Sequence, residues 1–321
     1  MNYVNEVESL YKETLHKLST GVNLTSVDFL GLNFDKRGQI EFKIYSPPIY
    51  QSKVSSSSCQ IEKYIYSNNM YRLTCVAHSL RGSRHYIVLK NKSKGNVKRL
   101  LNAVGYSCSW FGQYINQILS ISEMATISGC HTNNSETGRS SQTLADGYSS
   151  IHMIGFKTFS SGDSAVNIEW LTRKMSCEDS YSSDYSYDDK YYLSFLVSMD
   201  DSTIRTLCKE ANDLFFQEIE NDELHIWLFA SDYYKNSNCR FKLYFKCTEK
   251  TNPDSILSKL FFWTNCKSYY LCNSLDESNA YDQRCCEIES FIHTHESLKL
   301  YGFALGMSSI EKSINLYFTQ N

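Results

Sequence analysis

The strand-like stretch 239–247 is the feature that most constrains the fold of this chain. It reads Cys-Arg-Phe-Lys-Leu-Tyr-Phe-Lys-Cys. Side chains alternate between the two faces of a strand, so one face is apolar and the other is cationic and phenolic: Phe241, Leu243 and Phe245 against Arg240, Lys242, Tyr244 and Lys246. A solvated polar face would explain a single strand of this kind. The pattern recurs, which favours a fold that gives the polar face a shared purpose.

The same alternation appears in three more stretches. Their polar faces carry Lys43 and Tyr45 in 40–45, Asn167 and Glu169 in 166–170, and Asn315 and Tyr317 in 313–318. Each stretch follows a β-rich run and a polar turn, and the preceding runs are 29–34, 151–159, 224–230 and 301–307. Two such runs around a short turn predict a β-hairpin. The chain therefore repeats one hairpin at least four times.

A fifth, less regular hairpin is expected between the first two of these. Its strands are predicted at 60–66 and 71–78, around Asn68 and Asn69, with Arg72 on one face. The stretch 84–90 is the alternative source of one of its strands.

Helical periodicity separates the hairpins. Apolar residues at spacings of three and four predict helices over 4–18, 97–121 and 202–219, the last capped by Asp200 or Asp201. Pro253 opens a shorter helix over 254–262. Polar stretches near 130–148 and 176–190 are predicted to be mobile loops. Helix and hairpin repeat about every 75 residues in the later part of the chain, and we expect one domain over 1–321.

Composition excludes several classes of protein. The 321 residues are 42% hydrophobic, which is enough for a large core, and the net charge of −3 gives no overall attraction to nucleic acid or to a membrane surface. No apolar run approaches the roughly 20 residues of a membrane span. Twelve cysteines without a CxxC pair, and a start without a secretory signal, predict reduced thiols and a cytoplasmic protein.

Repeated antiparallel hairpins leave exposed strand edges unless the sheet closes on itself. We therefore predict an α+β fold in which about ten strands form a closed antiparallel β-barrel, with helices against the apolar outer face. The polar faces would then line a lumen that is wide enough for a ligand.

The motifs Lys43-Ile44-Tyr45 and Arg240-Phe241-Lys242-Leu243-Tyr244 resemble the second strands of the ABBA aromatic prenyltransferases. That family builds a ten-stranded barrel from five ααββ units. The resemblance implies two sets of residues: a diphosphate-binding set of Lys43, Arg72, Arg240, Lys242 and Asn167, and a carbocation shield of Tyr45, Tyr244 and Tyr317.

A shorter motif, Cys59-Gln60-Ile61-Glu62, is similar to the first barrel hairpin of the cyanobactin peptide prenyltransferases. There the glutamate acts as a base, which implies that Glu62 is the catalytic base. The alternative is an exposed strand residue beside Lys63.

The expected function is aromatic prenyl transfer. Cations would bind the diphosphate of an allylic donor, tyrosines would surround the allylic cation, and an indole, a phenol or a Trp/Tyr-containing peptide would accept the prenyl group. Since barrel cations can replace a metal, no cofactor is required and Mg²⁺ is optional. No metal site is expected, and the pair His293 and His295 lacks a second spaced ligand pair. We expect a monomer that binds neither nucleic acid nor membrane.

The alternative is a non-catalytic β-barrel protein that binds an anionic or aromatic ligand. Product formation from an allylic diphosphate and an aromatic acceptor distinguishes the two functions.

Overall fold

Ten strands close into one antiparallel barrel, in the order β1-β10-β9-β8-β7-β6-β5-β4-β3-β2. The computed structural model describes residues 6–19, 29–35, 39–46, 71–89, 94–130, 151–159, 164–171, 201–235, 238–264 and 280–320. The strands are β1 Phe29–Asp35, β2 Ile40–Ser46, β3 Tyr71–Ser79, β4 Gly82–Leu89, β5 Ile151–Phe159, β6 Ser164–Leu171, β7 Leu224–Tyr234, β8 Cys239–Cys247, β9 Leu298–Met307 and β10 Lys312–Gln320. The predicted fold class is therefore confirmed, and so are the four regular hairpins.

The second hairpin does not use the strand pair 60–66 and 71–78 that was the main prediction from sequence. β3 pairs with β4, with Ser79 opposite Gly82, so the alternative stretch beginning near Arg84 supplies the strand. Gly82 has a φ of 139°, a conformation that glycine adopts without strain and that suits a tight hairpin turn. The predicted strand 60–66 lies outside the described residues.

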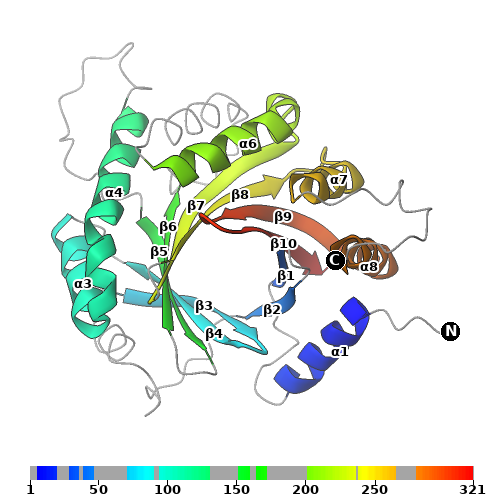
Figure 1. Ribbon diagram of the computed structural model, residues 1–321, viewed down its shortest axis with the longest axis horizontal. Coiled ribbons are helices and arrows are strands. Elements are labelled where there is room, and N and C mark those ends of the chain that lie inside the picture. The colour runs from blue at the N-terminus through cyan, green and yellow to red at the C-terminus, as the bar shows by residue number, and fades with distance from the viewer. Residues whose placement is uncertain are drawn as a thin grey trace.

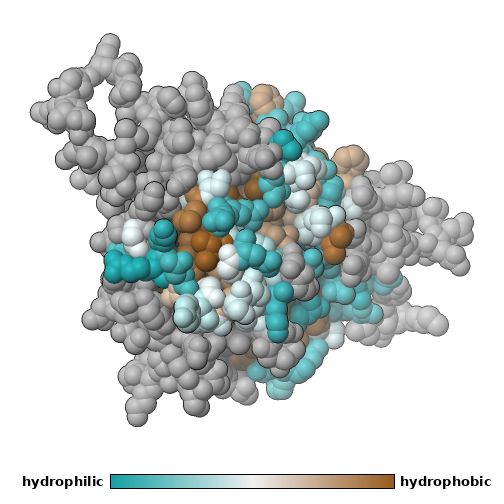
Figure 2. Space-filling view, turned by 60° about the vertical axis from the view of Figure 1, so that its left-hand side comes forward, coloured by the Kyte–Doolittle hydropathy of each residue, from teal (hydrophilic) through white to brown (hydrophobic). Residues whose placement is uncertain are grey.

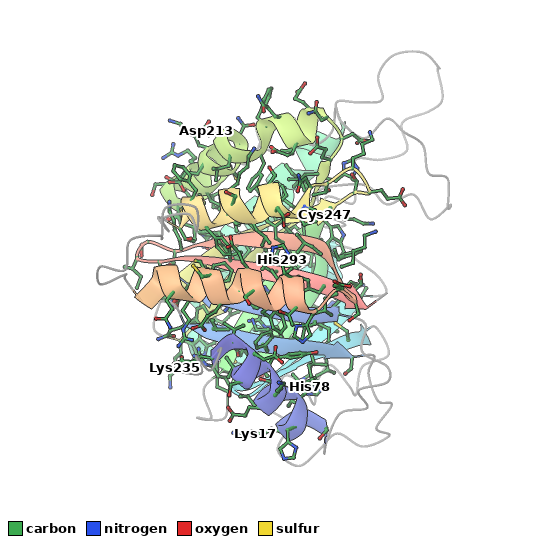
Figure 3. The ribbon with its side chains drawn as sticks, turned by 90° about the vertical axis from the view of Figure 1, so that its right-hand side faces the viewer. Lys17, His78, Asp213, Lys235, Cys247 and His293 are labelled. Carbon is green, nitrogen blue, oxygen red and sulfur yellow. The ribbon has the colours of Figure 1, made fainter. Side chains whose placement is uncertain are left out.

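Helices surround the barrel (Figure 1). They are α1 Glu6–Ser19, α3 Lys94–Ser107, the 3₁₀ helix η2 Ser109–Tyr114, α4 Ile115–Cys130, α6 Ser202–Glu220, α7 Pro253–Trp263 and α8 Ala280–Thr294. α3 and α4 cover one side, and α1, α8, α7 and α6 lie next to one another across the opposite side (Figure 3). In Figure 3, Lys235 and Cys247 mark the two ends of the barrel, because Lys235 follows β7 in a hairpin turn and Cys247 ends β8.

The prediction of a single long helix over 97–121 is wrong. The chain leaves the α-helix at Cys108, whose φ and ψ are −123° and 83°, and continues as η2 before α4 begins. This break turns two aromatic rings toward the barrel wall. Phe111 and Tyr114 pack against Tyr233, with ring centroids 5.6 and 4.6 Å away. Tertiary packing has overridden local periodicity here.

Capping residues set the starts of two helices. The Asp201 side chain accepts hydrogen bonds from the amides of Thr203 and Ile204, so Asp201 rather than Asp200 caps α6. Asn252 caps α7 in the same way, one residue before Pro253. α8 was not predicted.

The core lies between the outward strand faces and the helices. Phe42, Ile168, Phe241 and Leu316 are buried there, as predicted. Phe245 stacks on Phe303 at a centroid distance of 4.9 Å, and Phe215 of α6 packs against both rings. Burying each such side chain contributes about 1.5–3 kcal/mol.

The protein surface has few large apolar side chains among the described residues: Tyr106, Phe216, Phe262 and Ile310. On the face in Figure 2, hydrophilic and neutral residues surround a small hydrophobic group. Within the described part of the chain, no helix combines the length and the apolar character that a membrane span requires.

Candidate functional site

The inward faces of the strands follow a repeat that positions every side chain of the lumen. The first strand of each hairpin carries a small residue, a glycine or an alanine, on its inward face. On one side it pairs with a polar residue of its own hairpin, and on the other with a tyrosine or glutamate of the neighbouring hairpin. The five sets are Gly31 with Lys43 and Tyr317, Ala77 with Arg84 and Tyr45, Gly155 with Asn167 and Tyr86, Ala230 with Lys242 and Glu169, and Ala304 with Asn315 and Tyr244.

Small side chains at these positions make room for the long ones. A Cβ atom on Gly31 would lie 2.9 Å from Cε2 of Tyr45, and one on Gly155 would lie 3.1 Å from Cδ of Arg84. Both distances are shorter than ordinary van der Waals contact. The repeat thus allows five pairs of large inward side chains to share one lumen.

A cavity of about 250 Å³ lies at the end of the barrel that carries the hairpin turns. Its walls carry the cations Lys43, Arg81, Arg84, Lys157, Arg240 and Lys242 and the carboxylates Glu41, Asp232 and Glu311. Among the described residues, six cations against three carboxylates make this cavity positive in a protein whose net charge is −3. Such a cavity attracts anions.

Asp232 is the centre of the largest charge network. Its Oδ1 lies 3.1 Å from Nη1 of Arg84 and accepts a hydrogen bond from Nδ2 of Asn167 at 2.9 Å, and its Oδ2 lies 2.6 Å from Nζ of Lys242. The side chain of Asp232 is 1% exposed. Burial alone would raise the pKa of Asp232, but Arg84 and Lys242 outweigh it and hold the pKa well below its usual range. Burial lowers the pKa of Lys242 to about 8.

Glu41 organises a second group of charges across the cavity. Its carboxylate lies 3.5 Å from Nζ of Lys43 and 3.6 Å from Nζ of Lys157, and it accepts a hydrogen bond from Oγ of Ser79 at 2.7 Å. Burial opposes ionisation, yet the two lysines lower the pKa of Glu41 to about 2. Burial lowers the pKa of Lys157 to about 7, because the attraction of Glu41 offsets only part of the lost hydration.

The third carboxylate of the cavity, Glu311, holds Arg240. Its Oε2 lies 2.8 Å from Nη2 of Arg240, at the turn between β9 and β10. Every carboxylate that lines the cavity therefore contacts at least one cation.

Tyrosines form a second level, two residues further along the strands than the cations Lys43, Arg84 and Lys242 and, in β10, than Asn315. A two-residue step along a strand is about 7 Å. Ring centroids of Tyr86 and Tyr45 are 6.3 Å apart, those of Tyr45 and Tyr317 are 5.9 Å apart, and those of Tyr317 and Tyr244 are 5.9 Å apart. Burial raises the pKa of all four phenols well above the usual value, so they stay neutral. These four residues are called the tyrosine arc below.

Glu169 occupies the fifth position of this level, where a tyrosine stands in the other hairpins. It is 3% exposed, and burial raises its pKa to about 7 despite the nearby charges of Arg84 and Lys242. Among the described residues, none makes a hydrogen bond with its Oε2.

A small hydrophobic cluster lies on the same inward side. Leu228, Ala230, Tyr244 and Ala304 pack together, with Trp227 and Tyr317 against them. The lumen therefore changes along its length from charged to aromatic and apolar. An anion bound at the charged level would have its organic part against electron-rich rings from which water is excluded.

The structure brings most of the predicted site residues together. Lys43, Arg240 and Lys242 line the cavity, Asn167 binds Asp232 beside it, and Tyr45, Tyr244 and Tyr317 belong to the tyrosine arc. Arg72 lies in β3 opposite Val88, and its side chain is outside the described part of the structure. Glu62 also lies outside the described residues.

Sequence reasoning missed Arg84, Tyr86, Lys157 and Asp232. Arg84-His85-Tyr86 repeats the spacing of Lys43-Ile44-Tyr45, so this repeat could have identified β4. Asp232 was assigned to the turn that follows β7. β7 instead extends to Tyr234, and a register shift between Ile226 and Leu228 directs Asp232 inward.

Comparisons with known proteins agree with this architecture. No protein-family model matches the chain, and no curated protein matches it in sequence. Among solved structures, NotF prenyltransferase is similar over 92% of this chain and 80% of its own, with a TM-score of 0.55 and 8% identity. NotF in complex with brevianamide F and DMSPP is similar over 94% and 81%, with a TM-score of 0.53 and 9% identity. The chain thus has the fold of an aromatic prenyltransferase, as predicted.

Proposed function

We propose that the chain is an aromatic prenyltransferase. It transfers a dimethylallyl or longer prenyl group from its diphosphate to an aromatic acceptor such as an indole, a phenol or a Trp/Tyr-containing peptide. One observation carries the proposal: a level of cations and a level of tyrosines lie two residues apart on the same strands, in Lys43 and Tyr45, Arg84 and Tyr86, and Lys242 and Tyr244.

The two levels match the two ends of an ionising allylic diphosphate. As the C–O bond breaks, its electron pair goes to the diphosphate, and Lys43, Arg84 and Lys242 stabilise the growing negative charge. The allylic carbon becomes cationic beside the tyrosine arc, whose faces are electron-rich. A carbon of the acceptor ring then attacks the allylic carbon and loses its proton to a base. Glu62 remains the sequence-based candidate for that base.

Donor binding requires an exchange of partners in the cavity. Asp232 and Glu41 now hold Arg84, Lys242, Lys43 and Lys157, and a diphosphate would share these cations. Because the cations exceed the carboxylates, a diphosphate can be neutralised without a metal. We propose that Mg²⁺ is optional, which is tested by turnover in the presence of excess EDTA.

One structural neighbour, NotF, supports a pair of ligands of this kind. NotF forms a complex with brevianamide F and DMSPP, the latter being dimethylallyl thiolodiphosphate. We extend to this chain only the pairing of a prenyl diphosphate with an aromatic acceptor. The cytoplasmic location and the monomeric state remain predictions.

Incubation with dimethylallyl diphosphate and a panel of indoles, phenols and Trp peptides tests the function. Mass spectrometry should detect an acceptor heavier by one C5H8 unit, and Lys242→Met should abolish most of the product. Tight binding of both ligands to the wild type without product would contradict prenyl transfer and favour the non-catalytic binding protein.

A further inference from the structure

The tyrosine level of the lumen is not uniform. Around the barrel, β4, β2, β10 and β8 supply Tyr86, Tyr45, Tyr317 and Tyr244 in succession, and β6 completes the circle with Glu169. Four tyrosine rings and one carboxylate therefore surround the same part of the lumen.

Glu169 is a buried carboxylate with the properties expected of a ligand-binding group. Its side chain is 3% exposed, and its Oε2 has no hydrogen-bond partner in the part of the chain that the structure describes. No described residue lies within ion-pair distance of Glu169. A buried carboxylate oxygen without a partner is unfavourable and rare in folded proteins, so it calls for a specific explanation.

The other lumen carboxylates show how this barrel satisfies negative charge. Glu41 contacts Lys43 and Lys157, Asp232 contacts Arg84 and Lys242, and Glu311 contacts Arg240. Arg84 and Lys242 influence Glu169 electrostatically from β4 and β8, but both are bound to Asp232. Glu169 thus lacks the direct cation contact that the other three possess.

We propose that Glu169 binds an amine cation carried by the prenyl acceptor, so that the acceptors are arylalkylamines. Aromatic faces combined with a carboxylate recognise organic ammonium groups through cation–π attraction and charge-assisted hydrogen bonds. That the bound amine accepts a prenyl group rests on the proposed function. The binding of an amine to Glu169 does not depend on prenyl transfer.

The charges of the cavity also set an order of binding. The six cations that the structure describes in the cavity wall, against three carboxylates, repel a further cation while the cavity is empty. A bound diphosphate reverses this balance, and the amine then binds next to it. The ionised form of Glu169 is available near neutral pH, since its pKa is about 7. The amine therefore binds more tightly after the diphosphate.

The test is calorimetric and compares tryptamine with tryptophol, in which a neutral hydroxyl replaces the ammonium group. Both are titrated with and without inorganic diphosphate into the wild type, Glu169→Gln and Glu169→Tyr, the last restoring a tyrosine at the fifth position. Glu210→Gln is the matched control, because it removes one negative charge outside the barrel, where Glu210 contacts Lys312 and Trp263.

The wild type and Glu210→Gln should bind tryptamine about 10- to 100-fold more tightly than tryptophol, the range of a charge-assisted hydrogen bond. Both Glu169 variants should bind the two compounds about equally, with tryptophol affinity retained as the sign of an intact barrel. Equal affinities in the wild type, or a preference for tryptamine that survives in a Glu169 variant, would overturn the proposal. An amine preference without any prenylated product would instead reject prenyl transfer alone.

Discussion

The outward and inward faces of the barrel strands are stabilised by different interactions. Outward residues such as Phe245 and Trp170 pack against helices or neighbouring rings, where many apolar shapes contribute similar energy. Inward residues such as Asp232 satisfy specific partners through charge and hydrogen bonds. The two sets alternate along a single strand, so adjacent substitutions should separate stability from ligand binding.

The largest effect is expected on the outward face, from Phe245→Ala. Phe245 is 1% exposed and contacts Phe303 and Phe215, so its removal leaves a cavity. We expect the free energy of unfolding to fall by about 3–5 kcal/mol, as measured by urea denaturation. The free energy of unfolding should fall less in Phe245→Leu, because leucine fills part of the cavity. Diphosphate affinity should not change in Phe245→Leu, and a change above a few-fold would mean that the two faces are coupled.

Asp232→Asn tests the inward face. The amide keeps the shape of the carboxylate but leaves Arg84 and Lys242 without their counter-charge. The free energy of unfolding should fall by about 2–3 kcal/mol. Inorganic diphosphate should stabilise this variant more than the wild type in thermal unfolding, because the bound anion replaces the missing charge. Equal stabilisation of both proteins would show that the anion binds elsewhere.

Removing a cation should affect binding more than folding. Replacing Lys242 or Arg240 by Ala should weaken binding of a non-reactive allylic diphosphate analogue by about 1.5–3 kcal/mol in calorimetry. Lys242 should give the larger loss, since its side chain is 6% exposed and that of Arg240 is 20% exposed. Unchanged affinity in both variants would reject the diphosphate site.

The smallest effect concerns the pH dependence of binding. Lys157, with a pKa of about 7, faces Glu41, Lys43, Arg84 and Asp232. Above this pH the lysine is mostly neutral in the free protein, and a bound diphosphate favours its charged form and so raises its pKa. Affinity should therefore fall by up to about tenfold between pH 6.5 and 8.5, with proton uptake visible as a buffer-dependent binding enthalpy. Lys157→Met should reduce this dependence, and the remainder should come from Lys242, whose pKa is about 8.

Much of the fold could be predicted from alternation within the strands. The outward position of Phe241 and the inward position of Lys242 follow from the period of two and need no tertiary information. Closure of the sheet followed from the need to remove exposed strand edges, whereas the diphosphate role came from the resemblance to a family. That resemblance correctly indicated the fold, while the roles of the individual residues remain predictions.

The rest depends on features that alternation does not encode. Asp232 faces inward because the register of β7 shifts near Ile226, and a shift of one residue moves every later side chain to the opposite face. The helix break at Cys108 exists because Phe111 and Tyr114 pack on Tyr233, more than a hundred residues later in the sequence. The hydrogen bond from Asn167 to Asp232 likewise joins residues 65 positions apart in the sequence, and alternation within a strand does not predict it.

The pairing of β1 with β10 has a consequence for synthesis of the protein. Leu30 pairs with Phe318, so the first strand leaves the ribosome long before its second neighbour exists. At roughly 5–20 residues per second, the wait is about 15–60 s. During that time one edge of β1 offers unpaired backbone groups, and the barrel can close only after β10 has been synthesised. Deletion of β10, residues 312–320, should therefore leave an open sheet that aggregates, even though every hairpin before β9 is intact.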